Sequence, residues 1–209
     1  MSIKGRLARA LGSRDEAPNI ELAEVIAAAQ DQKAVRELAG LIATGSKPQR
    51  HDAIKVLYEI GARDAALIVP ETDRVLECLG TRDNRMIWGV LSVLDAIKTD
   101  IPERLMGHLV QILAAADRSS VIANDRLMSI LSHLNGITDF RPVIEPVLLQ
   151  RLSQAAVNQF PMYAEMAAES MSAEGLPAFR DILQRRHEDI SYPAKKARIA
   201  KVLRKVSAA

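Results

Sequence analysis

Aromatic residues and cysteine are scarce in this sequence. Phe, Trp and Tyr make up 3% of the 209 residues, and Cys78 is the single cysteine. One cysteine cannot form an intrachain disulfide, and the apolar neighbours of Cys78 indicate a small buried side chain. Few aromatics argue against a β-sandwich, whose strands favour aromatic and β-branched residues. Because the chain has a single cysteine and no intrachain disulfide, we expect reducing, cytoplasmic surroundings.

Long apolar runs and a strong charge of one sign are also absent. No run of about 18 apolar residues occurs, so no membrane span is expected. The formal net charge is +2, which is too small to predict a polyanionic partner by itself. The hydrophobic share is 48%, an ordinary value for a folded protein, so disorder is not expected.

The N-terminal part differs from the rest of the chain. Residues 1–18 form a basic amphipathic segment, in which Ile3, Leu7 and Leu11 recur every four residues. Such a segment is either a docked first helix or a helix that contacts a membrane surface or a partner. Asn19 is a candidate N-cap for the helix that follows. We predict one helical-repeat domain over residues 19–209.

A repeat appears when the apolar positions of five segments are aligned. Successive copies are offset by 34, 40, 36 and 36 residues. Such a period in an all-helical pattern predicts stacked helix pairs, each hiding its apolar stripe against the next pair. The aligned core positions are Ala53, Leu57 and Ile60; Ile87, Leu91 and Leu94; Leu127, Leu131 and Leu134; Tyr163, Ala167 and Ser170; and Ile199, Leu203 and Val206.

Between these segments lie the expected partner helices. Proline or acidic residues, which favour a first helical turn, open them. We predict them over residues 70–79, 101–115 and 176–186, with a further one entered at Pro146.

The period and the segment RHDAIKVLYEIG at residues 50–61 resemble HEAT and armadillo repeats. The resemblance covers about residues 20–206 and concerns the fold. It implies an all-α protein, a right-handed α-solenoid of about five stacked helix pairs. Proteins of this kind are mostly non-enzymatic interaction scaffolds, and that implication is an analogy.

No pattern predicts catalytic residues, a cofactor or a metal site. The histidines lack the short ligand spacing that metals require. HEAT-like alkylpurine DNA glycosylases resemble the architecture, and they hold a damaged nucleotide with aromatic residues and a carboxylate. Trp88 and Asp95 lie on one side of a predicted helix, but one tryptophan is fewer than that family uses. A glycosylase is therefore the third hypothesis, and Trp88 is interpreted first as a core residue.

The first hypothesis is a protein-interaction scaffold. A helical wheel places Met86 and Val93 opposite the core stripe, on an inner surface where a peptide or helical partner would bind. A second copy of the chain or an intrachain helix would be alternative covers for this surface. The predicted partner contacts are Arg85, Met86, Trp88, Val93 and Met162.

The second hypothesis is a nucleic-acid-binding module. The last helix carries a basic face, which is typical either of a solvated capping helix or of a phosphate-contacting patch. No aromatic residues are interleaved with it to stack on bases. The candidate contacts are Lys196, Arg198, Lys201, Arg204 and Lys205.

Overall fold

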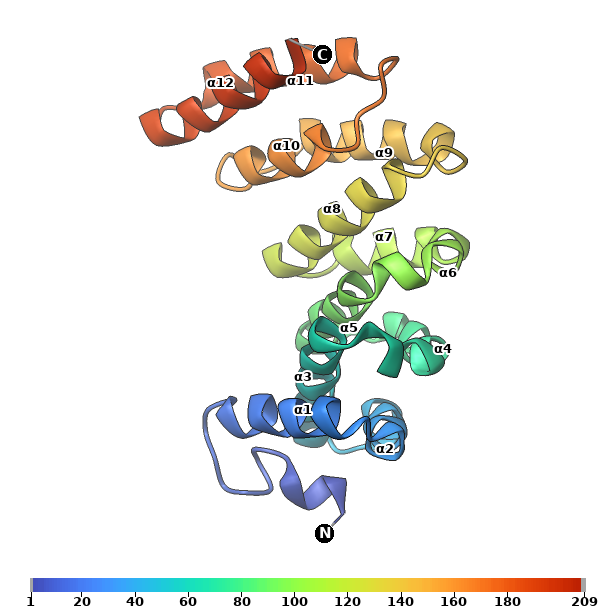
Figure 1. Cartoon of the computed structure of the whole chain (residues 1–209). Coiled ribbons are helices and arrows are strands. Elements are labelled where there is room, and N and C mark those ends of the chain that lie inside the picture. Colours follow the sequence, from blue (N-terminus) through green and yellow to red (C-terminus); the bar gives the residue numbers. More distant parts are fainter. Residues whose placement is uncertain (1, 208–209) are drawn as a thin grey trace. The chain divides into compact units, whose positions relative to one another are not determined.

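The computed structural model describes residues 2–207, which contain helices and loops but no strand. The all-α prediction is confirmed. The chain forms two compact units, Met1–Leu127 and Met128–Ala209, and the boundary falls inside helix α8 (Val121–Asn135). Figure 1 shows the order of the elements along the chain. Each unit is described by itself.

The first unit has two layers of helices (Figure 1). One layer holds α1 (Ala17–Ala29), α3 (Lys47–Arg63) and α5 (Asn84–Ala96). The other holds α2 (Gln32–Thr44), α4 (Thr72–Glu77), α6 (Pro102–Gly107) and α7 (Leu109–Asp117). Helix α3 packs against α1, α2 and α5, so it lies at the centre of the unit. Short 3₁₀ turns connect these helices at Ala65–Leu67, Val69–Glu71, Cys78–Gly80 and Lys98–Asp100.

Helices α3 and α5 approach each other closely at Gly89. A Cβ atom on Gly89 would lie 2.8 Å from Cγ1 of Ile54, so only glycine allows this approach. A Cβ on Gly61 of α3 would lie 3.3 Å from the Cβ of Ala96. Both pairs are 35 residues apart in the sequence, so the two helices run side by side in a constant register.

A similar offset recurs in hydrogen bonds between other elements. In the first unit Gln32 Nε2 donates to the carbonyl of Leu67, 35 residues away. In the second unit Asn135 Nδ2 donates to the carbonyl of Ser170, again 35 residues away. An offset close to the sequence period therefore recurs in contacts within each unit.

The second unit also has two layers. Helices α9 (Arg141–Ser153) and α11 (Leu176–Asp189) contact each other, as do α10 (Phe160–Ala168) and α12 (Pro193–Ser207). Phe160 and Phe179 are the largest fully buried side chains of its core. Glu145 of α9 is also buried, and it accepts hydrogen bonds from the backbone N–H and hydroxyl of Ser172 at 2.8 and 2.7 Å.

The predicted core stripe is buried in the first three copies, where each of its residues is at most 1% exposed. Ser170 and Leu203 of the last two copies are partly exposed. Apolar residues at helical spacing thus identified the packed side of α3, α5 and α8 correctly.

Several predicted helix boundaries were wrong. The helix expected over residues 70–79 is α-helical only over Thr72–Glu77, with a 3₁₀ turn on either side, and the one expected over 176–186 extends to Asp189.

The single helix expected over residues 101–115 is broken at His108, whose N–H bonds to carbonyls of α6 and ends that helix. Helix α9 begins at Arg141 with Pro142 in its first turn, and Pro146 lies inside the helix. A proline in the first turn removes an N–H that has no helical partner, so Pro142 was the better entry signal.

The N-terminal segment is docked onto the first unit as a short 3₁₀ helix, Ile3–Arg6, followed by turns. Ile3 and Leu7 are buried in the core, whereas Leu11 is 57% exposed. Their predicted common face therefore does not exist, because the segment leaves the helical conformation before Leu11.

Buried polar side chains hold this segment in place. The N–H of Ala8 donates to Oδ1 of Asn19, and the N–H of Arg9 donates to Oδ2 of Asp52, both at 2.9 Å. Asn19 Nδ2 donates to Asp52 Oδ1 at 3.0 Å. Asn19 is fully buried inside α1, which begins at Ala17, so its assignment as an N-cap was wrong.

Candidate functional site

The exposed strip on α3 and α5 is narrower than the helical wheel predicted. Met86 and Val93, two of the predicted partner contacts, are 0% exposed and belong to the core. The helical-wheel prediction assumed that each helix is covered on one side only, by the partner helix of its own pair. Because α3 packs along the flank of α5 at Gly89, a second side of α5 is also covered. Arg85 and Trp88 remain partly exposed.

Ion pairs of alternating sign connect α1, α3 and α5 across this strip. Glu24 pairs with Arg63 at 2.9 Å, and Arg63 pairs with Glu59 at 2.6 Å. Glu59 also pairs with Lys55 at 2.7 Å. Lys55 then lies 3.5 Å from Glu16, whose other oxygen pairs with Arg85. We call the surface formed by Glu16, Glu24, Lys55, Tyr58, Glu59, Arg63, Arg85 and Trp88 the aromatic–ionic face.

Two aromatic rings lie within this face. The centroids of Tyr58 and Trp88 are 6.0 Å apart, with an angle of 50° between the ring planes. Lys55 Nζ lies 4.6 Å from the Tyr58 centroid, and Arg85 Cζ lies 5.9 Å from that of Trp88. Both rings are partly exposed. The face thus combines apolar ring surface with cations placed over the rings.

The surroundings fix the charge state of these groups at neutral pH. Burial raises the pKa of Tyr58, so its phenol stays protonated. Burial alone would lower the pKa of Lys55, but hydrogen bonds to Glu59 and Tyr58 outweigh it and raise that pKa. Burial opposes ionisation of Glu59, yet hydrogen bonds from Lys55 and Arg63 hold its pKa below the ordinary value.

The depressed pKa of Glu59 predicts a loss of stability in acid. In the folded chain this carboxyl holds its proton less readily than in the unfolded chain, so it stabilises the fold above its ordinary pKa of 4.5. This contribution disappears as the pH falls through the folded-state pKa. We expect Glu59→Gln to make the free energy of unfolding less dependent on pH below about pH 5.

Urea denaturation at neutral pH and at about pH 3 measures this effect. Glu37→Gln is the matched control, because Glu37 is exposed on α2 and its replacement removes the same carboxylate charge away from the ion pairs of Glu59. If wild type and Glu59→Gln lose the same free energy on acidification, the ion pairs of Glu59 do not act as described.

A charged cleft adjoins the aromatic–ionic face and shares Glu16 and Arg85 with it. Its volume is about 390 Å³. The docked N-terminal segment and the loop after it supply one wall, and the start of α3 supplies the other. The lining residues are Arg9, Arg14, Asp15, Glu16, Lys47, Pro48, His51, Asp52 and Arg85.

Asp83 anchors the helix starts beside this cleft. Its Oδ1 accepts the N–H groups of Arg85 and Met86, so it caps α5. Its Oδ2 lies 2.8 Å from Nε2 of His51 and 3.8 Å from Nζ of Lys47. Burial opposes ionisation of Asp83, but the His51 and backbone hydrogen bonds lower its pKa. Asp83 thereby holds His51 in position, whereas Lys47 makes only a long contact with it.

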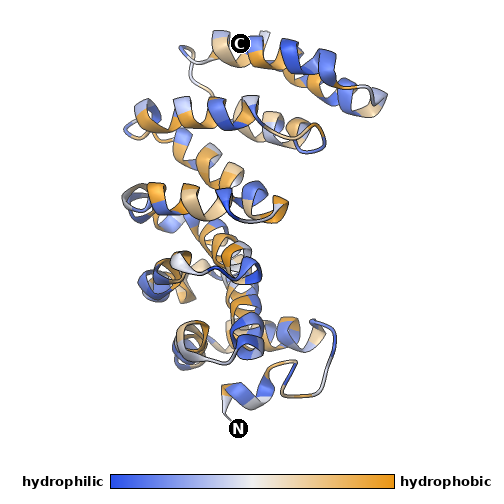
Figure 2. Ribbon diagram, turned by 180° about the vertical axis from the view of Figure 1, so that it is seen from behind, coloured by the Kyte–Doolittle hydropathy of each residue, from blue (hydrophilic) through white to orange (hydrophobic). Residues whose placement is uncertain are grey.

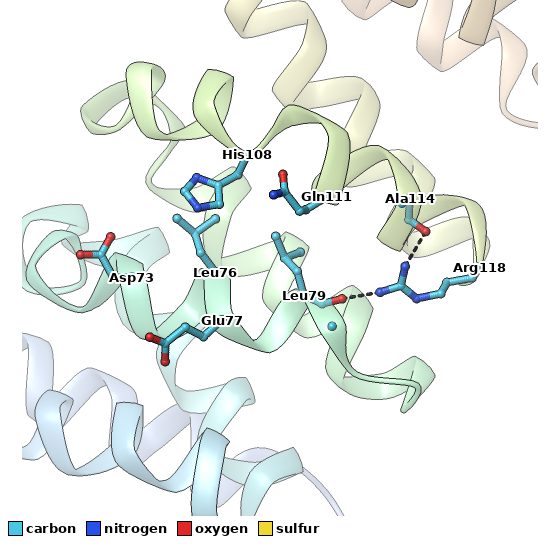
Figure 3. A pocket seen from close by; sticks show the side chains of 9 residues that line it. Asp73, Leu76, Glu77, Leu79, His108, Gln111, Ala114 and Arg118 are labelled. Carbon is cyan, nitrogen blue, oxygen red and sulfur yellow. Dashed lines mark hydrogen bonds between the residues drawn. The ribbon is translucent and has the colours of Figure 1, made fainter.

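A second cavity, of about 540 Å³, lies between α4 and α7 (Figure 3). Leu76 and Leu79 form its apolar floor, and Arg118 spans one end by donating to the carbonyls of Ala114 and Leu79. His108 Nδ1 lies 2.9 Å from the carbonyl oxygen of Arg104, so that nitrogen carries the proton. Of these hydrogen bonds, only the one from Arg118 to Leu79 crosses the cavity, and it joins the end of α7 to the 3₁₀ turn after α4.

The remaining predicted contacts lie in the second unit. Met162 is partly exposed on α10. On α12 the basic residues face outward, and Figure 2 shows its alternation of hydrophilic and hydrophobic positions. Arg198 Nη2 pairs with Glu165 at 2.6 Å, and Lys205 pairs with Glu169 at the same distance. Acidic partners reduce the positive potential that a nucleic-acid backbone needs. The other predicted contacts on this helix are Lys196, Lys201 and Arg204, and Lys195 beside them donates to Asn158.

Sequence reasoning missed Tyr58 and Glu16. Tyr58 follows Lys55 by three residues on α3, so the spacing could have placed it on the same face. No pattern could have found Glu16, because its contacts with Lys55 and Arg85 depend on the loop before α1.

No group of three metal-ligating side chains occurs among residues 2–207, and none of the helices there is both long and apolar enough to cross a bilayer. No protein-family model matches the sequence, and no curated protein matches it.

Proposed function

We propose that this protein is a non-enzymatic interaction scaffold built from HEAT-like helix pairs, which binds a peptide or helical protein partner on the aromatic–ionic face. A right-handed α-solenoid of about five pairs over residues 19–209 is part of the proposal. The offset of about 35 residues between contacting elements supports it, because repeats of this length stack pair on pair.

The arrangement of Tyr58 and Trp88 beside a continuous chain of ion pairs carries the proposal. Binding hot spots are enriched in Trp, Tyr and Arg, and they are surrounded by polar groups that exclude water. Here the two rings and Arg85 form such a centre. The surrounding charges already pair with one another, so a partner can cover the rings without leaving an isolated buried charge.

A displayed library of random peptides, selected on the immobilised full chain, tests this function. We expect enriched peptides whose affinity falls with Trp88→Ala by about 2 kcal/mol, roughly 30-fold. Tyr192→Ala is the matched control, because Tyr192 is an aromatic residue that is 67% exposed in the second unit. That variant should bind the same peptides as tightly as wild type.

Circular dichroism of both variants establishes that each is folded before binding is compared. Peptides that bind Trp88→Ala as tightly as wild type would place the interaction elsewhere on the chain. Failure to enrich any sequence over repeated selections would contradict peptide binding itself.

A further inference from the structure

The carboxylates that line the charged cleft are already engaged within the chain. Oδ1 of Asp15 accepts the N–H of Ala17 at 2.9 Å. Both oxygens of Asp52 accept hydrogen bonds, from the backbone of Arg9 and from Asn19. Glu16 pairs with Lys55 and Arg85. Most carboxylate oxygens that line the cleft therefore already accept a hydrogen bond or pair with a cation of the same chain.

Several cationic groups that line the cleft are not satisfied in this way. The guanidinium groups of Arg9 and Arg14 are exposed and contact no acceptor among the residues that the structure describes. Lys47 has only a long contact with Asp83, at 3.8 Å. Arg85 adds a further positive charge to the lining, although its Nη2 is engaged by Glu16. The cleft thus presents a surplus of donors and of positive charge.

We propose that this cleft binds a phosphorylated side chain of the partner peptide. A phosphoryl group carries up to two negative charges and three terminal oxygens, and guanidinium groups bind such oxygens in pairs. A carboxylate offers only two oxygens and one charge, so it would leave more of these donors without an acceptor. The cleft volume of about 390 Å³ is ample for a phosphorylated side chain.

The position of the cleft agrees with this assignment. Arg85 lines the cleft and also lies over the Trp88 ring, so the cleft and the aromatic–ionic face are continuous. A peptide on that face would carry its phosphorylated residue into the cleft. The inference rests on the proposed function for the identity of the ligand, but the anion site itself can be tested without any partner.

The test is an NMR titration of the ¹⁵N-labelled full chain, which follows the arginine Nε–H and tryptophan indole resonances. The probes are a capped Ala-phosphoserine-Ala tripeptide, its serine and glutamate counterparts, and inorganic phosphate. We expect saturable shifts with the phosphopeptide and binding at least about tenfold tighter than to the glutamate peptide.

Arg9→Gln combined with Arg14→Gln is expected to weaken phosphopeptide binding by about tenfold or more. Arg9→Gln keeps the backbone N–H that Asp52 accepts, so the N-terminal segment should stay docked. Arg82→Gln combined with Lys33→Gln is the charge-matched control, because both residues are exposed but do not line the cleft. It should leave the affinity unchanged.

Absent or non-saturable shifts, or equal binding by the double variant and wild type, would overturn the anion site. Inorganic phosphate that binds as tightly as the phosphopeptide would assign the cleft to a free anion and overturn the partner assignment. If library peptides bind the aromatic–ionic face while the phosphopeptide does not bind, this inference fails and the proposed function stands.

Discussion

Replacement of Gly89 by valine is expected to lower the free energy of unfolding by about 2–3 kcal/mol, because the added side chain overpacks the contact between α3 and α5. Even a Cβ atom at this position would lie 2.8 Å from Cγ1 of Ile54. Ile54 is 1% exposed and cannot move aside into solvent. The two helices must therefore separate, or Ile54 must leave its preferred rotamer.

Gly40→Val is the matched control for this prediction. Gly40 also lies inside a helix, α2, but a Cβ there would have nothing within 4 Å. Valine has a slightly better helix propensity than glycine, so the control should be close to neutral. Urea denaturation followed by circular dichroism measures both variants.

A double-mutant cycle with Ile54→Ala identifies the contact itself. Removing the Ile54 side chain makes room beside residue 89, so the double variant should be more stable than the sum of the two single effects predicts. Additive effects, or a Gly89→Val variant as stable as the Gly40→Val control, would show that α3 and α5 do not pack in this register.

Replacement of Glu145 by alanine is expected to destabilise the second unit by about 2–4 kcal/mol, because several buried donors lose their acceptor. The carboxyl group of Glu145 accepts the N–H and the hydroxyl of Ser172, at 2.8 and 2.7 Å. Asn135 Nδ2 lies 3.4 Å from the same carboxyl. Glu145 thereby connects α9 to α8 and to the loop that enters α11.

Glu174→Ala is the control for Glu145→Ala. Glu174 lies in the same loop, but its side chain is exposed, so its removal should change stability by less than about 0.5 kcal/mol. Hydrogen exchange resolved by peptide should show faster exchange in α9 and α11 of Glu145→Ala, with α1 and α3 unchanged. Uniformly unchanged exchange would contradict this role for Glu145.

The helical class and the packed sides of the helices could be predicted because they depend on local periodicity. Leu57, Leu91 and Leu131 recur at helical spacing along their segments, and all three are fully buried. The burial of Met86 and Val93 could not be predicted in the same way. It depends on how closely a neighbouring helix approaches, and that distance is set by Gly89 meeting Ile54 on another segment.

The candidate site was predicted only in part for a similar reason. Arg85 and Trp88 were found because they lie near the exposed edge of a recognisable helix. The N-terminal wall of the cleft was not found, because it depends on two backbone N–H groups bonding to Asn19 and Asp52. Asn19 follows Pro18, and asparagine is one of the residue types preferred at helix N-caps. Nothing in the local sequence distinguishes an N-cap asparagine from one that is buried inside the helix.

The most direct test of the account is the accessibility of Trp88 in a complex with a selected peptide. Trp88 is the only tryptophan in the chain, so its fluorescence reports on the aromatic–ionic face alone, provided that the peptide contains no tryptophan. The account predicts that a saturating peptide shifts the emission to shorter wavelength and protects Trp88 from quenching by acrylamide. Unchanged emission and quenching at saturation would show that the partner binds away from this face.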